Sequence, residues 1–205
     1  MGFDELFDSS GLPLVLKQAK TLSKEECRAI YNYMKEYKPK VILEFGTQFG
    51  CSTRVFLELA NWLGRKVELH SWDIVDQIKP ICVDKNSFTF HKEDMSGREE
   101  EIVAKYNPDM LFLDAHPYSL TKNLMQVCLK HKINFLTHDV ALKLYESLQT
   151  RSDNFKNLKA YGAWELYILA ELFGDTLLTE DHYEDEKVQI DFTRDLWGLS
   201  IILVK

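Results

Sequence analysis

Two apolar runs in the second half of the sequence each end in acidic and imidazole side chains. LFLDAHPY places Asp114 and His116 after the first run, and LTHDV places His138 and Asp139 after the second. Burying such groups is costly unless they are paired, hydrated or bound to a metal ion. Imidazole titrates near neutral pH and suits proton transfer, and carboxylates beside imidazole also suit cation binding. We therefore expect these four residues to share one functional cleft. An alternative role for His138 is to orient Asp139 while both bind substrate or structural water.

The stretch VILEFGTQFG runs from apolar residues into Glu44 and then into two glycines, Gly46 and Gly50, that are four residues apart. Glycine lets the backbone turn sharply and lets a ligand approach where a Cβ would intrude. A helix is expected directly after this turn, and the amides of its first turn point towards the same place. The dinucleotide fingerprint GxGxxG is absent, because Gln48 stands where its second glycine would be. The stretch predicts a ligand-binding loop between a strand and a helix.

The elements that must position these residues alternate between strands and helices. Apolar runs predict buried strands, and apolar residues at helical spacing predict the helices between them. Ser23 is expected to cap the first of these helices. The expected strands are 40–45, 66–74, 88–90, 109–113 and 133–137, and the expected helices are 22–37, 52–63, 98–106, 119–131 and 161–173. This alternation is typical of a mainly parallel sheet with helices on both faces.

The C-terminal part of the sequence has a different pattern. Two β-rich runs within 185–205 are separated by a short break near 196–198, which suits an antiparallel pair because a parallel return needs a long crossover. The acidic stretch 180–187 is expected to be a solvated loop. We predict an α/β fold: a doubly wound, mainly parallel seven-stranded sheet with helices on both faces and a C-terminal antiparallel hairpin. Residues 1–205 are expected to form a single domain, with 1–38 as an N-terminal helical extension.

The amino-acid composition and net charge of the chain indicate which classes of partner it is expected to bind. Hydrophobic residues make up 45% and charged residues 28%, and the net charge is −7 from 25 basic and 32 acidic side chains. This acidic balance gives no electrostatic basis for binding nucleic acid. No apolar run reaches the roughly 20 residues of a membrane-spanning helix. The four cysteines form no CxxC pair, so we expect reduced thiols, and without a secretory signal pattern we expect a cytoplasmic protein. The sequence leaves open whether the chain forms a homo-oligomer.

The ExGxxxG pattern at Glu44, Gly46 and Gly50 resembles motif I of class I S-adenosylmethionine-dependent methyltransferases. This resemblance implies the Rossmann-like methyltransferase fold and S-adenosylmethionine as cofactor. It places Glu44 near the positive charge and amines of the cofactor, and Asp73, which is 27 residues after Gly46, near the ribose hydroxyls. Asp94 and Met95 would contact the adenine amino group and ring. The full set of implied cofactor residues is Glu44, Gly46, Thr47, Gly50, Ser52, Asp73, Asp94, Met95 and Asp114.

The segments LFLDAHPY and LTHDV narrow the resemblance to small-molecule O-methyltransferases of the macrolide-sugar and cephalosporin-biosynthesis type. Catechol-type O-methyltransferases resemble this arrangement and hold a divalent cation at these strand ends. That resemblance implies magnesium or manganese, with Asp114, His138 and Asp139 as its ligands. His138 departs from the usual pattern, in which a carboxylate is commoner at this position. Imidazole suits manganese, iron or zinc better than magnesium. His116 is our first choice as the base that accepts the proton of the acceptor hydroxyl, and Asp139 is the second.

The function that the sequence favours is methyl transfer from S-adenosylmethionine to a hydroxyl of a small molecule or sugar. Three aromatic residues on or beside the late helix, together with Tyr118, are candidates either for an aromatic acceptor pocket or for core packing: Tyr161, Trp164 and Tyr167. One alternative function is a cofactor-binding partner domain without catalysis. Another is methylation of protein or nucleic acid, although the acidic charge and the lack of an NPPY-like motif disfavour base methylation.

Overall fold

The computed structural model describes residues 2–19, 21–78, 86–115, 117–140, 164–178, 180–193 and 198–205. They divide into two compact units, Met1–Met95 and Ser96–Lys205. We describe each unit by itself, and the single-domain organisation stays a prediction.

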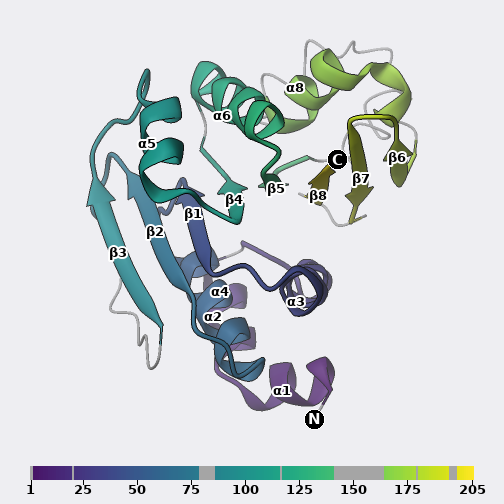
Figure 1. Ribbon diagram of the computed structural model, residues 1–205. Helices are drawn as coiled ribbons and strands as arrows, with labels where there is room; N and C mark the ends of the chain where they lie inside the picture. Colours follow the sequence, from purple (N-terminus) through teal and green to yellow (C-terminus); the bar gives the residue numbers. More distant parts are fainter. Residues whose placement is uncertain are drawn as a thin grey trace. The chain divides into compact units, whose positions relative to one another are not determined.

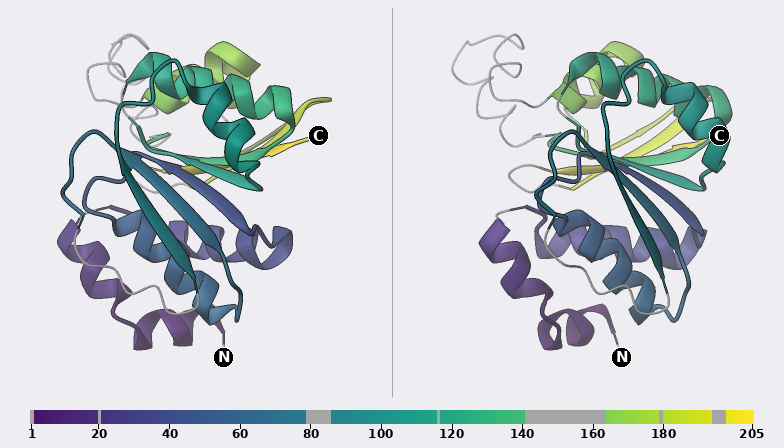
Figure 2. Two further views of the ribbon diagram at one scale, coloured as in Figure 1. Left: turned by 60° about the vertical axis from the view of Figure 1, so that its left-hand side comes forward. Right: turned by 90° about the vertical axis from the view of Figure 1, so that its left-hand side faces the viewer.

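The first unit contains a parallel three-stranded sheet in the order β3-β2-β1. Its helices lie together on one side of these strands (Figure 1, Figure 2). The elements in chain order are α1 Phe3–Ser9, α2 Leu12–Ala19, α3 Lys24–Tyr37, β1 Val41–Phe45, α4 Cys51–Trp62, β2 Glu68–Asp73 and β3 Ser87–Lys92. Three helices, α1 to α3, precede β1 among the described residues, and their role as an N-terminal extension stays a prediction.

Local sequence signals explain where these elements begin. Ser23 caps α3: its hydroxyl accepts a hydrogen bond from the Glu26 amide at 3.1 Å, and the Glu26 carboxylate accepts one from the Ser23 amide at 2.6 Å. This capping box satisfies two amides that a helix would otherwise leave unpaired, and it confirms the predicted cap. The strand β1 is buried along almost its whole length. Such burial on both faces is expected of a parallel strand.

The second unit contains five strands in the order β4-β5-β8-β7-β6. β4 and β5 are parallel, and β8, β7 and β6 follow with antiparallel pairing at each step. The α-helices that the structure describes in this unit lie on one side of these strands (Figure 2). The elements are α5 Glu99–Tyr106, β4 Met110–Leu113, α6 Tyr118–His131, β5 Asn134–His138, α8 Trp164–Phe173, a 3-10 helix Asp175–Leu178, β6 His182–Glu184, β7 Val188–Phe192 and β8 Leu199–Val204.

The α/β class, the parallel strands and the C-terminal antiparallel hairpin are as predicted. One prediction was wrong: the stretch 180–187 is not entirely a loop, because β6 pairs with β7 through His182, Tyr183 and Glu184. The described residues therefore form eight strands rather than seven. Sequence analysis did not predict this strand, because its stretch is rich in charged side chains. At the edge of a sheet such side chains are tolerated, because backbone pairing on one side suffices.

Two further properties concern the whole set of described residues. Within that set no helix is both long and apolar enough to cross a membrane. Cys27, Cys51 and Cys128 are free thiols, as predicted, and Cys82 lies outside the described residues.

A polar contact joins α6 to α8 in the second unit. Glu171 accepts a hydrogen bond from Lys122 Nζ at 2.8 Å and another from the hydroxyl of Tyr118. The hydrogen bond from Lys122, followed by that from Tyr118, lowers the pKa of Glu171 to about 2. The side chains of Lys122 and Glu171 are 32% and 31% exposed, so water screens part of their attraction.

We expect the stabilising effect of Glu171 to depend on pH. A carboxylate with a lowered folded pKa stabilises the fold above its unfolded pKa of about 4.3, and this effect is lost as the pH falls towards the folded value. Glu171→Gln should therefore lower the free energy of unfolding by about 1 kcal/mol at neutral pH, and by progressively less as the pH falls from about 4 to about 2. Urea unfolding of both chains over this range measures the difference. A difference that stays constant with pH would contradict the role of the carboxylate charge.

Candidate functional site

Glu44, at the end of β1, anchors the loop that follows it. Ser52 Oγ donates a hydrogen bond to Glu44 Oε1 at 2.5 Å, and the hydroxyls of Thr53 and Ser71 both donate to Oε2. Glu44 is completely buried. Hydrogen bonds to a carboxylate are strong, and three of them offset the cost of removing its charge from water. Glu44 thus joins β1 to the first turn of α4 and to β2.

The loop between β1 and α4 turns through three residues with left-handed backbone angles. The angle φ is 94° at Gly46, 46° at Gln48 and 78° at Gly50. Glycine adopts such angles without steric cost, which explains both glycines of the ExGxxxG pattern. Gly50 is also the N-cap of α4 and supplies no side-chain cap. The N-cap residue of α4 therefore makes no side-chain hydrogen bond to the amides of the first turn.

Asp73, the last residue of β2, holds the middle of this loop. Its Oδ2 accepts a hydrogen bond from the Gln48 amide at 2.7 Å, and its Oδ1 accepts one from the Val75 amide at 2.9 Å. Nearby, the Gly46 amide donates to the Trp72 carbonyl at 3.0 Å. A carboxylate oxygen has acceptor capacity for two hydrogen bonds, so these contacts leave Asp73 able to accept more from a ligand.

The other predicted cofactor residues of the first unit lie in different surroundings. Thr47 is buried, and its hydroxyl donates to the Trp72 carbonyl at 3.2 Å. Thr47 and Ser52 therefore use their hydroxyl protons within the chain. Asp94 is exposed, whereas Met95 beside it is buried.

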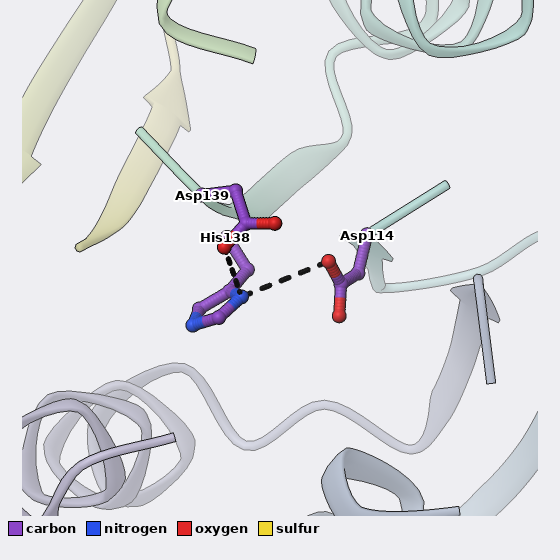
Figure 3. A group of neighbouring side chains, drawn as sticks. All are labelled: Asp114, His138 and Asp139. Carbon is purple, nitrogen blue, oxygen red and sulfur yellow. Dashed lines mark ion pairs between the residues drawn. The ribbon is translucent and has the colours of Figure 1, made fainter. Parts of the chain in front are cut away.

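The second unit brings Asp114, His138 and Asp139 together at the ends of β4 and β5 (Figure 3). His138 Nδ1 lies 3.1 Å from Asp139 Oδ1 and 3.6 Å from Asp114 Oδ1. The His138 side chain is 7% exposed, and those of Asp114 and Asp139 are 25% and 20% exposed. The structure thus groups three of the four residues that sequence analysis expected in one cleft. We call these three residues the Asp–His–Asp cluster.

A left-handed residue creates part of this arrangement. Asp139 follows β5 directly and has a φ of 59°. Consecutive residues of a strand point to opposite faces of a sheet. The left-handed turn at Asp139 breaks this alternation, so that its carboxylate returns to the ring of His138. Asp tolerates this conformation better than most residues, and strained backbone of this kind is enriched at functional sites.

His116 lies outside the residues that the structure describes, so its place beside the cluster stays a prediction. Its neighbour Ala115 is described, and the Ala115 carbonyl accepts a hydrogen bond from Thr121 Oγ1 of α6 at 2.5 Å. Of the aromatic residues considered for an acceptor pocket, Tyr118 and Tyr167 lie with their ring centroids 5.9 Å apart. Tyr161 and the side chain of Trp164 are outside the described part of the chain.

The Asp–His–Asp cluster fits a divalent cation. One ligand atom from each of its residues lies within 4.8 Å of the other two. Two carboxylate oxygens and an imidazole nitrogen are a donor set that manganese, iron or zinc accepts, whereas magnesium prefers oxygen ligands alone. The chemistry of the donor set therefore favours manganese over magnesium among the two predicted ions.

Glu165, in the first turn of α8, belongs to this region but was missed by sequence analysis. It is completely buried, and neither carboxylate oxygen has a hydrogen-bond partner among the described side chains and backbone. Burial raises the pKa of Glu165 well above its usual range, and the nearby carboxylates of Asp114 and Asp139 raise it further. His138 acts in the opposite direction. Glu165 therefore lies within electrostatic reach of all three residues of the cluster.

A signal for Glu165 was present in the sequence. Ile168 and Leu169 follow it at helical spacings of three and four, and both are fully buried. Residues at these spacings share one helix face. An acid on the apolar face of a helix is unusual, and this spacing pointed to a buried carboxyl.

No protein-family model matches the sequence, and no curated protein matches it. Solved structures nevertheless share its fold. An O-methyltransferase from Bacillus cereus in complex with SAH is 14% identical, with 98% of this chain and 96% of that chain covered and a TM-score of 0.58. An SAH-bound methyltransferase from Podospora anserina is 13% identical over 99% of this chain and 86% of that chain, with a TM-score of 0.56.

A third solved structure is that of the mycinamycin-biosynthesis methyltransferase MycE with Mg, SAH and mycinamycin VI. It is 12% identical, with 95% of this chain and 54% of that chain covered and a TM-score of 0.56. At these identities the likeness concerns the fold. It confirms the Rossmann-like methyltransferase fold that the sequence predicted.

Removing one hydroxyl donor from Glu44 should destabilise the first unit. Thr53→Val replaces the hydroxyl by a methyl group of similar size and leaves the buried carboxylate with one donor fewer. We expect a loss of about 1–3 kcal/mol in the free energy of unfolding, measured by urea denaturation. Thr89→Val, at an exposed position of β3, is the matched control and should change stability by less than about 0.5 kcal/mol. Equal stability of the two variants would show that Glu44 does not depend on this hydrogen bond.

Proposed function

We propose that this protein transfers a methyl group from S-adenosylmethionine to a hydroxyl of a small molecule. The observation that carries the proposal is the loop between β1 and α4, in which Gly46, Gln48 and Gly50 have left-handed angles and Asp73 holds the Gln48 amide. The shared fold supports it, because solved structures with this fold include O-methyltransferases with bound SAH. S-adenosylmethionine supplies an activated methyl group when bound.

The first unit would bind this cofactor. The glycines let the backbone approach the ligand closely, and Asp73 has acceptor capacity left for the ribose hydroxyls. Sequence analysis expected Glu44 to contact the cofactor directly. We propose a different role for it here. Because its oxygens accept hydrogen bonds from Ser52, Thr53 and Ser71, we assign it the role of a positioning residue that fixes the loop. Asp94 and Met95 stay assigned to the adenine by resemblance.

The second unit would bind the acceptor through a divalent cation held by Asp114, His138 and Asp139. The 3.1 Å and 3.6 Å distances from His138 Nδ1 to the two carboxylates support this set. A bound cation polarises an acceptor oxygen and eases loss of its proton. The donor set makes manganese our first choice. The magnesium in the MycE structure shows that a protein of this fold can bind a divalent cation.

His116 is our proposed proton acceptor, with Asp139 as the second choice. Its position two residues after Asp114 in the chain supports this assignment. A base whose pKa lies near the working pH gives the most effective proton transfer, and unperturbed histidine, with a pKa of about 6.5, meets this condition. A small acceptor is favoured over nucleic acid because the chain carries a net charge of −7.

We expect S-adenosylmethionine or its demethylated product to bind with micromolar affinity. Gly46→Val introduces a β-branched side chain at a φ of 94°, and Asp73→Ala removes the acceptor that orders the loop. Each should weaken binding at least about tenfold, which corresponds to about 1.4 kcal/mol. Calorimetry measures the affinity, and Asp76→Ala, which removes an exposed acid nearby, is the control that should leave it unchanged. Unaltered affinity in both folded variants would remove the cofactor assignment, and equally strong dinucleotide binding would favour a different cofactor.

Turnover on a panel of hydroxylated acceptors tests the catalytic part of the proposal. His116→Ala should lower the rate by about 100-fold or more, the usual scale of general-base catalysis, while the affinity for S-adenosylmethionine stays nearly unchanged. The matched control is His131→Ala, which alters an exposed histidine on α6. A His116→Ala chain that turns over at the parent rate would show that His116 is not the base. Cofactor binding without turnover on any acceptor would favour the non-catalytic partner domain.

A further inference from the structure

Glu165 is a buried acid that pairs with none of the described residues. It lies in the first turn of α8, is completely buried, and has no hydrogen-bond partner for either oxygen among the described residues. A buried carboxyl group without partners is destabilising, because it has lost its hydrogen bonds to water and gained none in return. The chain therefore carries a stability cost at this position that an apolar residue would avoid.

The surroundings of Glu165 make it more unusual. Asp114 and Asp139 disfavour a further negative charge beside them, and His138 offsets this only in part. Two carboxylates and a buried third carboxyl group therefore lie within electrostatic reach of one another. Such an arrangement becomes favourable when a cation occupies it, because a bound divalent cation is the largest local charge and reverses the sign of these interactions.

Glu165 does not belong to the inner ligand set. Among the described residues, only Asp114, His138 and Asp139 bring ligand atoms within 4.8 Å of one another. A carboxylate just outside such a set typically accepts hydrogen bonds from the groups that the cation itself binds, and it orients them. Water molecules and an acceptor hydroxyl are donors of this kind.

We propose that Glu165 is the outer carboxylate of the divalent-cation site formed by Asp114, His138 and Asp139, where it accepts a hydrogen bond from a water molecule or acceptor hydroxyl bound to the cation. This inference rests on the cation of the proposed function and adds a fourth residue to it. Glu165 acts through a cation-bound group, so it is a positioning residue rather than a ligand. The N-terminal turn of α8 supports the assignment, because a helix N-terminus stabilises negative charge.

The test measures Mn²⁺ binding to the 205-residue chain by calorimetry, together with the Tm of the same chain in a chelator. Glu165→Gln keeps the shape of the side chain and removes its charge, and should weaken Mn²⁺ binding about 10- to 100-fold, the scale found for outer-sphere residues. Glu165→Met should weaken it similarly. It should also raise the Tm of the metal-free chain by about 2–4 °C, because an unpartnered polar group is removed from the interior. A purely structural acid would give the opposite change in Tm.

Glu171→Gln is the matched control, because it removes a carboxylate from the same helix at a partly exposed position. It should leave Mn²⁺ affinity within about twofold of the parent, since screening weakens its field. Parent-like Mn²⁺ affinity in Glu165→Gln overturns the role of Glu165 while the cation site stands. A metal-free Tm lowered by more than about 4 °C in both Glu165 variants identifies a structural residue and also overturns it. Failure of the parent chain to bind Mn²⁺, or equal binding by Asp139→Ala, overturns the cation site itself and this inference with it.

Discussion

The hydrogen bonds to the buried carboxylate of Glu44 are the interaction on which the first unit depends. Three hydroxyls from α4 and β2 converge on a charge at the end of β1. A carboxylate without these donors would be unfavourable in the interior, and the hydroxyls without the carboxylate would be buried donors with nothing to bond. Each side of the arrangement therefore requires the other. The left-handed loop begins directly after this anchor, so its shape is fixed by a contact that lies inside the fold.

The second unit also buries a carboxyl group, but the described residues supply no hydrogen-bond partner for it. The oxygens of the buried Glu44 carboxylate have partners supplied by the chain, whereas those of the buried Glu165 have none among the described residues, and burial raises the pKa of Glu165 well above its usual range. The first arrangement is complete without a ligand and stabilises the fold. The second places Asp114 and Asp139 around His138 at the ends of β4 and β5, and we propose that a bound cation makes it favourable. Comparing the two shows how the surroundings, rather than the residue type, separate a structural carboxylate from one available for function.

Much of this architecture could be predicted because its signals are local. The cap at Ser23 and the apolar runs before Glu44 and Asp114 need no knowledge of distant residues. The grouping of Asp114 with His138 was also accessible, since adjacent parallel strands end at the same edge of a sheet. Three features were not predicted. The strand β6 has charged side chains and depends on pairing with β7, the left-handed turn at Asp139 leaves no pattern in composition, and Glu165 acquires its meaning only from residues far away in the sequence.

The contact between α6 and α8 has a mechanical consequence. Lys122 and Tyr118 on α6 bind Glu171 near the end of α8, and Thr121 on α6 holds the Ala115 carbonyl after β4. The hydrogen bonds to Glu171 therefore couple the position of α8 to that of α6. Any movement of α8 that displaces its first turn must carry α6 and the segment after β4 with it, or else break the bonds to Glu171 at the far end.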